Sequence, residues 1–282
     1  MNGLHELPLV IFTVLAQSVV GAFLLFSMVL FTTQDKFYRA YVHKAMFILL
    51  AMLGVGFIAS LAHLGSPFRA FNSLNRVGES MLSNEIASGA LFFAIVGLYW
   101  LLSVFDKLPK VFGSLLLVLA SAVGLLFMYM MNMVYHISTV PTWDSHFTTW
   151  GFYLTVILSG FTLGYALLHT ERPGGNSVSW VPTVVSIAAL VAAVVSMCQG
   201  FALGDIVTSV QKATALVPDF ATLTALRFTL IGLAVVCLFY AVHKPSSIVT
   251  KIFAVLCILV GEMIGRTLFY GLHMTAGMAI GA

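Results

Sequence analysis

The sequence predicts an all-α, polytopic integral membrane protein with eight transmembrane helices. Of its 282 residues, 60% are hydrophobic and 8% are charged, whereas a water-soluble domain is nearer half apolar. The apolar residues also form continuous runs of about 20, enough for a helix to cross a bilayer, without the alternation of a membrane β-barrel. We therefore expect one eight-helix membrane domain over 1–282, with spans at about 8–31, 45–62, 86–105, 111–135, 149–169, 180–201, 222–242 and 252–272.

Each run has its own sequence signal. The first has no cationic leader and no small-x-small cleavage site, and it exceeds a signal-peptide core, so we expect a retained helix. The second is the shortest, and the third begins directly after Glu85. The fourth to seventh follow DKLPK, VPTW, a Gly- and Ser-containing link and ALVPD, and the eighth carries GEMIGR. Tryptophans near the predicted ends would act as interfacial anchors; they are Trp100, Trp143, Trp150 and Trp180.

The distribution of cations predicts an orientation. Loops one, three, five and seven hold eight Lys and Arg residues, and the remaining loops and adjoining helix ends hold five. The positive-inside rule then places the odd loops in the cytoplasm and both termini in the periplasm. The longer loops would face the outer, periplasm-like side.

A weak internal similarity relates FTVLAQSVVG in the first helix to LTVILSGFTLG in the fifth. It suggests two four-helix halves, as in membrane proteins built from repeats. The alternative is chance similarity between two apolar segments.

Several functional classes fit the composition poorly. The net charge of +3 is small and scattered, which argues against nucleic-acid binding. The three cysteines form no CxxC pair, so we expect neither an iron–sulfur cluster nor a metal site in this chain. All eight histidines fall near helix ends, which argues against a haem held in the bilayer and leaves one between two surface turns as an alternative. The helix centres carry no ionisable residue, which argues against a transporter or channel.

Loop two gathers the polar chemistry in the stretch HLGSPFRAFNSLNRVGESMLSNE, residues 63–85. His63 directly follows the second helix and Glu85 precedes the third, so both should lie at the outer membrane boundary. A quinol suits such a place, because its tail prefers lipid while its ring must give up protons to a titratable base such as histidine or a desolvated carboxylate. If this is a quinol site, we expect His63 and Glu85 to be the catalytic pair, with Arg69 or Asn84 holding the ring or steadying the carboxylate. The candidate quinol-binding residues are His63, Gly65, Ser66, Arg69, Phe71, Asn84 and Glu85. The alternative is a polar docking surface.

Four more residues are candidates for structural or supporting roles. Glu262 and Arg266 lie four apart in GEMIGR, the favourable orientation for a same-face ion pair; a role beside a polar ligand is the alternative. Arg76 and Arg227 would lie at the outer face, where a solvated charge and a contact with a partner protein are the alternatives. His273, in HMTAGMA, belongs to a tail that either covers the quinol or packs at the helix end.

Long motifs carry a resemblance to a known family. HLGSPFRAFNSLNRVG, SNEIASG, VPTW, ALVPD, GEMIGR and FYGLHMTAGMA closely resemble the membrane anchor subunit (the DmsC family) of anaerobic dimethyl sulfoxide reductase, and the likeness spans essentially the whole sequence. The resemblance implies an eight-helix anchor that oxidises menaquinol, with roles for the residues here numbered His63, Arg69 and Glu85.

The resemblance also implies partners and a pathway. A four-cluster iron–sulfur subunit would bind directly, and a molybdopterin catalytic subunit would receive menaquinol electrons through it to reduce S- and N-oxides in anaerobic respiration. Haem, clusters and molybdenum would be absent from this chain. The alternatives are a purely structural anchor and the anchor of a sibling complex that reduces selenate or another oxyanion.

Overall fold

The computed structural model describes residues 3–63, 67–207, 212–244 and 247–275. These residues are helical, with no β-strand beyond an isolated bridge between Val207 and Lys212. Eight helices are long and apolar enough to cross a membrane, which confirms the predicted fold class. The long helices are α1 (Leu7–Thr32), α2 (Lys36–His63), α3 (Met81–Val104), α4 (Lys110–Met133), the continuous fifth span α5 (His146–Thr155), η3 (Val156–Phe161) and α6 (Thr162–Leu168), and then α7 (Val181–Ala202), α8 (Phe220–His243) and α9 (Ile248–Gly271).

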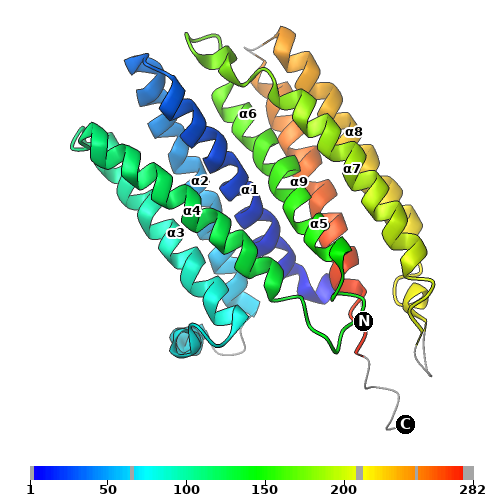
Figure 1. Cartoon of the computed structure of the whole chain (residues 1–282). Helices are drawn as coiled ribbons and strands as arrows, with labels where there is room; N and C mark the ends of the chain where they lie inside the picture. Colours follow the sequence, from blue (N-terminus) through cyan, green and yellow to red (C-terminus); the bar gives the residue numbers. More distant parts are fainter. Residues whose placement is uncertain (1–2, 64–66, 208–211, 245–246, 276–282) are drawn as a thin grey trace.

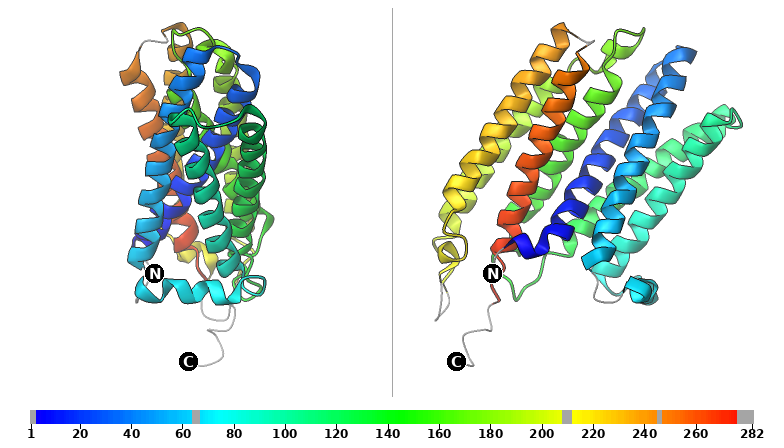
Figure 2. Two further views of the ribbon diagram at one scale, coloured as in Figure 1. Left: turned by 90° about the vertical axis from the view of Figure 1, so that its left-hand side faces the viewer. Right: turned by 180° about the vertical axis from the view of Figure 1, so that it is seen from behind.

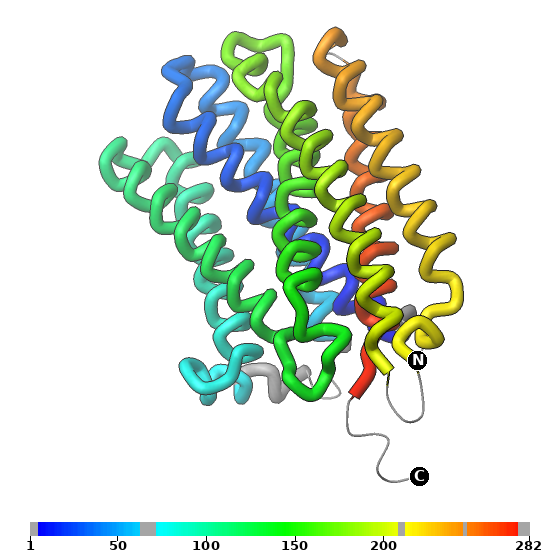
Figure 3. Tube along the Cα trace, turned by 45° about the vertical axis from the view of Figure 1, so that its right-hand side comes forward, coloured from blue at the N-terminus to red at the C-terminus, as the bar shows by residue number. Residues whose placement is uncertain are grey.

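The helices run side by side, so the connections fall at two ends of the bundle (Figure 1). The amino-terminal η1 (Gly3–Glu6) and the end of α9 lie at one end, which we call the terminal end. The 3₁₀ helix η2 (Pro67–Arg76) and the connections after α4 and α7 lie at the same end (Figure 3). The loops with the cationic excess therefore share the opposite end, which is the arrangement that the charge count predicts; its direction in a membrane stays a prediction.

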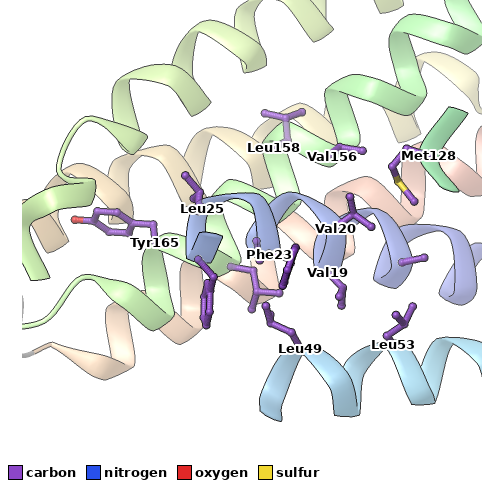
Figure 4. Packing of buried hydrophobic residues seen from close by; sticks show 14 of the residues in the cluster. Val19, Val20, Phe23, Leu25, Leu49, Leu53, Met128, Val156, Leu158 and Tyr165 are labelled. Carbon is purple, nitrogen blue, oxygen red and sulfur yellow. The ribbon is translucent and has the colours of Figure 1, made fainter. Parts of the chain in front are cut away.

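Helix α1 forms the centre of the bundle. Of its most apolar 18-residue window, 83% is buried inside the protein, against 22% for α8. Val19 of α1 faces Leu49 and Leu53 of α2 (Figure 4). Val20 lies on the opposite side of α1, towards Val156 of the fifth span (Figure 4). A helix buried on all sides needs no amphipathic pattern, so α1 is apolar all round.

The two similar segments of sequence contact each other at this centre. A Cβ atom added at Gly160 would lie 2.5 Å from the Cα atom of Gly21, so only glycine allows this approach. The Ser18 hydroxyl donates to the Ser159 hydroxyl at 2.8 Å beside the crossing. Here the fifth span is a π-helix, η3, a local widening that often marks a specialised contact. The similarity therefore has a packing role, whatever its origin.

The helices extend beyond the predicted apolar runs where polar residues continue them. Helix α2 begins at Lys36 instead of residue 45, and the Asp35 carboxylate accepts from the Tyr38 backbone N–H at 2.7 Å, as a capping residue does. The Tyr38 and Tyr41 hydroxyls then donate to the Leu168 and Leu167 carbonyls at 2.6 and 2.8 Å. These bonds satisfy carbonyls that the end of α6 leaves without helical partners.

Candidate functional site

Loop two lies crosswise at the terminal end of the bundle. Its η2 helix packs against the end of α2 and the start of α3, roughly perpendicular to them (Figure 2). Gly65 and Ser66 lie outside the described residues, as do the side chains of His63, Arg69 and Phe71. The backbone of His63 ends α2, at the boundary position that the sequence predicts.

A tight turn joins η2 to α3. Gly78 has a φ of +93°, which favours glycine, and its N–H donates to the Asn84 side-chain oxygen at 2.6 Å. Asn84 therefore fixes the turn that presents Glu85. Arg76 and Glu79 form an exposed pair at 3.7 Å, with side chains 71% and 74% exposed, and such a pair contributes little stability.

Glu85 lies in the second turn of α3 and is 3% exposed. Its Oε1 atom is buried without a hydrogen-bond partner. A buried carboxyl oxygen without a partner costs free energy, because it has lost water and gained nothing. Such an atom is what a ligand hydroxyl would satisfy.

A pair of tyrosines faces Glu85 from two other helices. The hydroxyls of Tyr135, just after α4, and Tyr270, at the end of α9, lie 2.5 Å apart. Burial raises the pKa of the Tyr135 phenol well above its usual range, and the charges of Tyr270 and Glu85 raise it further. Tyr135 therefore stays protonated and remains a hydrogen-bond donor. Sequence reasoning missed both tyrosines; Tyr270 lies in the FYGLHMTAGMA motif, which was the available signal.

Two of the long sequence motifs bind each other beside this pair. The Thr142 hydroxyl and the Trp143 indole of VPTW donate to the Leu272 and Phe269 carbonyls at 2.6 and 2.8 Å. The His273 ring lies 4.7 Å from the Trp143 ring, centroid to centroid. These contacts close the end of α9, so His273 packs at the helix end in the described part of the tail.

The prediction that Glu262 and Arg266 pair with each other is wrong about the partner. Glu262 accepts from Arg227 of α8, at 2.9 Å from Nη2 and 3.3 Å from Nε, both at Oε1. Its Oε2 accepts from the Thr155 hydroxyl at 2.5 Å. Gly265 leaves room for the arginine, since a Cβ atom there would lie 2.7 Å from the Arg227 Nε. Arg227 is thus bound inside the bundle, where the sequence suggested an outer-face cation.

Arg266 turns towards α1 and the fifth span. Its Nη2 donates to the Gln17 side-chain oxygen at 2.7 Å, and its Cζ atom lies 3.6 Å from the centroid of the Phe152 ring. Gln17 in turn donates to the Phe152 carbonyl at 2.9 Å. A glutamine in the most buried helix was a visible signal of this role. The described residues contain no group of three His, Cys, Asp or Glu residues that could hold a metal ion.

Comparison with known proteins identifies the family. The family described as "DMSO reductase anchor subunit (DmsC)" matches residues 1–272. The protein belongs to this family. It is 50% identical over 280 residues to the C subunit of anaerobic dimethyl sulfoxide reductase from Haemophilus influenzae, with 99% of each sequence covered. It is 48% identical over 282 residues to the YnfH subunit of anaerobic dimethyl sulfoxide reductase from Escherichia coli K12 and 45% identical over 285 residues to the C subunit from that organism, again with 99% of each sequence covered.

Membership in this family confirms the resemblance, and a membrane-anchor family agrees with the eight membrane-length helices. The protein is a multi-pass membrane protein of the anchor-subunit type. Its terminal end carries two buried polar clusters, one around Glu85 and one around Glu262.

Proposed function

We propose that this protein anchors a dimethyl sulfoxide reductase complex in the membrane and oxidises menaquinol for it. The quinol ring would bind at the terminal end, between the end of α2 and the start of α3. One observation carries this proposal: the Glu85 Oε1 atom is buried without a partner, at the start of the helix that follows loop two, and loop two itself begins after His63 at the end of α2. The 45–50% identity to dimethyl sulfoxide reductase subunits supports the choice of complex.

The residues at this place suit a quinol. Its hydroxyls need acceptors, which Glu85 offers, and its reduced and oxidised forms both need donors nearby, which the Tyr135–Tyr270 pair offers. The turn held by Gly78 and Asn84 fixes the backbone before Glu85. We infer that Gly65, Ser66, Arg69 and Phe71 complete the site from loop two.

Menaquinol releases two electrons and two protons when it is oxidised. In this proposal His63 and Glu85 each accept one proton, and both electrons pass to the partner subunit. Arg69 steadies the ring or the ionised carboxylate. Protonated His63 and Glu85 then lose their protons to water at the terminal end, so protons and electrons leave on the same side and no charge crosses the membrane.

The proposed surroundings follow from the same arrangement. The terminal end would face the periplasm of a bacterium, with the protein in the inner membrane. An iron–sulfur subunit would bind over loop two and the connection after α4, and a molybdopterin subunit would bind to it. Those partners would hold the clusters and the molybdenum.

The test uses the whole complex with His63→Gln or Glu85→Gln. We expect quinol-dependent turnover to fall at least a hundredfold, because general bases contribute about 10²–10⁴ in rate, while reduction driven by an artificial dye stays normal. Glu79→Gln is the matched control, since that carboxylate belongs to the same loop and is exposed.

Two outcomes would reject this assignment. If both variants keep full quinol-dependent turnover, the protein is a structural anchor and the quinol binds elsewhere. If dye-driven turnover falls equally, the residues serve assembly. A complex that reduces selenate or another oxyanion in place of S-oxides would change the terminal acceptor and leave this site as proposed.

A further inference from the structure

A pocket opens at the terminal end, in the half of the bundle away from loop two. It is partly open to the surroundings, and residues of α5, α7, α8 and α9 line it. Helices α2 and α3, which carry the loop-two site, lie on the other side of α1 (Figure 1). The polar lining includes Thr155, Thr224, Arg227, Glu262 and Arg266.

The positive and negative charges that line this pocket are unequal in number. Arg227 and Arg266 bring two positive charges, and Glu262 brings one negative charge. Both Glu262 oxygens are already engaged, one by Arg227 and the other by Thr155. The pocket therefore holds an excess of one positive charge.

The excess charge belongs to Arg266. This residue is 5% exposed, and its direct contacts include the Gln17 amide at 2.7 Å and the Phe152 ring. Glu262 acts on it only at longer range, because that carboxylate is paired with Arg227. In the part of the sequence that the structure describes, it forms no ion pair with a carboxylate, Glu85 included. A buried cation without a counter-ion is costly, so this arrangement favours binding of an anion.

Two polar atoms remain available for that anion. The Arg266 Nε and the Thr224 Oγ1 are both buried without hydrogen-bond partners. An N–H and a hydroxyl can both donate, so together they fit an acceptor-rich anionic group such as a phosphate.

The walls and the depth of the pocket suggest where the phosphate comes from. Phe147, Phe152, Phe220 and Phe269 line it, which suits a ligand with an apolar body. Arg266 is five residues from the end of α9, about 8 Å at the helical rise, which is near the headgroup layer. We propose that this pocket binds the phosphate of an anionic phospholipid from the leaflet at the terminal end, with its acyl chains towards the bilayer.

The experiment measures lipid retention by the purified complex. The complex is equilibrated in vesicles of phosphatidylglycerol or of zwitterionic phosphatidylcholine, extracted, and analysed by native mass spectrometry. We expect one phosphatidylglycerol bound through this subunit, and at least tenfold weaker retention in Arg266→Gln. Arg76→Gln is the matched control, because Arg76 is a cation at the same end whose side chain is exposed.

Further variants keep the test decisive. If Arg266→Gln does not assemble, Thr224→Val removes one hydroxyl at nearly constant volume and should weaken retention several-fold, whereas Arg266→Lys should keep it. Equal retention of phosphatidylcholine, equal retention by the variants, or a bound quinone in place of the lipid would overturn the proposal. Displacement of the lipid by millimolar inorganic phosphate would show a free-anion site and overturn the lipid assignment. This inference does not rest on quinol oxidation.

Discussion

Glu85 and Glu262 carry two buried carboxyl groups at the same end of one bundle, and their surroundings differ sharply. Glu262 is 2% exposed and binds Arg227 and Thr155 with both oxygens. Glu85 is 3% exposed, and its Oε1 has no partner. The two side chains are therefore almost equally buried, but only Glu262 has a hydrogen-bond partner at each carboxyl oxygen.

This difference separates a structural role from a functional one. A carboxylate with its hydrogen bonds complete holds helices together, because breaking any bond leaves a buried charge. A buried carboxyl oxygen without a hydrogen-bond partner destabilises the ligand-free protein. A ligand that forms the missing bond removes this cost, and such groups are common at functional sites. Glu262 should therefore matter for stability and Glu85 for turnover.

The largest expected effect comes from removing Arg227, the cation that binds Glu262. Arg227→Leu leaves Glu262 buried with only Thr155 as a partner, so we expect the free energy of unfolding to fall by about 3–5 kcal/mol. The measurement is the denaturation midpoint of the purified complex. The double variant Arg227→Leu, Glu262→Leu should recover most of the loss, because an apolar pair of similar volume is often neutral. A double variant as unstable as the single one would show that the loss does not come from leaving Glu262 without its counter-ion.

The second prediction compares the two acids under the same substitution. Glu262→Gln should destabilise by about 3 kcal/mol, since it removes the charge that Arg227 neutralises. Glu85→Gln should change stability by about 1 kcal/mol or less, although it removes quinol-dependent turnover in the proposed function. Equal destabilisation by both substitutions would remove the distinction between the two clusters.

The sequence could predict the eight spans because apolar length is a local property of each segment. It could also mark Glu85, since an acid beside a long apolar run is visible without any fold. It could not predict the partner of Glu262. The spacing to Arg266 fits one helix, but Arg227 lies 35 positions away on α8, and Gly265 gives it room against α9. Tyr135 and Tyr270, which are 135 positions apart, likewise meet only because the segment just after α4 lies beside the end of α9.

A smaller effect should follow from the second donor to Glu262. Thr155→Val keeps the volume and removes the hydroxyl that donates to Oε2. Hydrogen bonds to charged groups contribute about 1.5–3 kcal/mol, so we expect a loss in that range. Thr229→Val is the matched control, since its exposed hydroxyl bonds only its own helix at the Ala225 carbonyl. A loss no larger than that of the control would mean that Arg227 alone satisfies the acid.

The smallest effect concerns the tyrosine pair beside Glu85. Tyr135→Phe removes one hydroxyl of a hydrogen-bonded pair, and we expect a loss of about 1 kcal/mol at neutral pH. Burial raises the pKa of Tyr135 in the folded protein, so its contribution is full below the unfolded value of about 10 and is lost as pH rises further. Above pH 10, Tyr135 loses its proton in the unfolded protein but keeps it in the folded protein, so the free energy of unfolding falls as pH rises. This fall should be less steep in Tyr135→Phe than in the unmodified complex. The exposed Tyr129, changed to Phe, serves as the control. An unaltered alkaline slope in Tyr135→Phe would mean that the cluster around Glu85 is as open to water as the surface, and the contrast between the two carboxylates would then lose its physical basis.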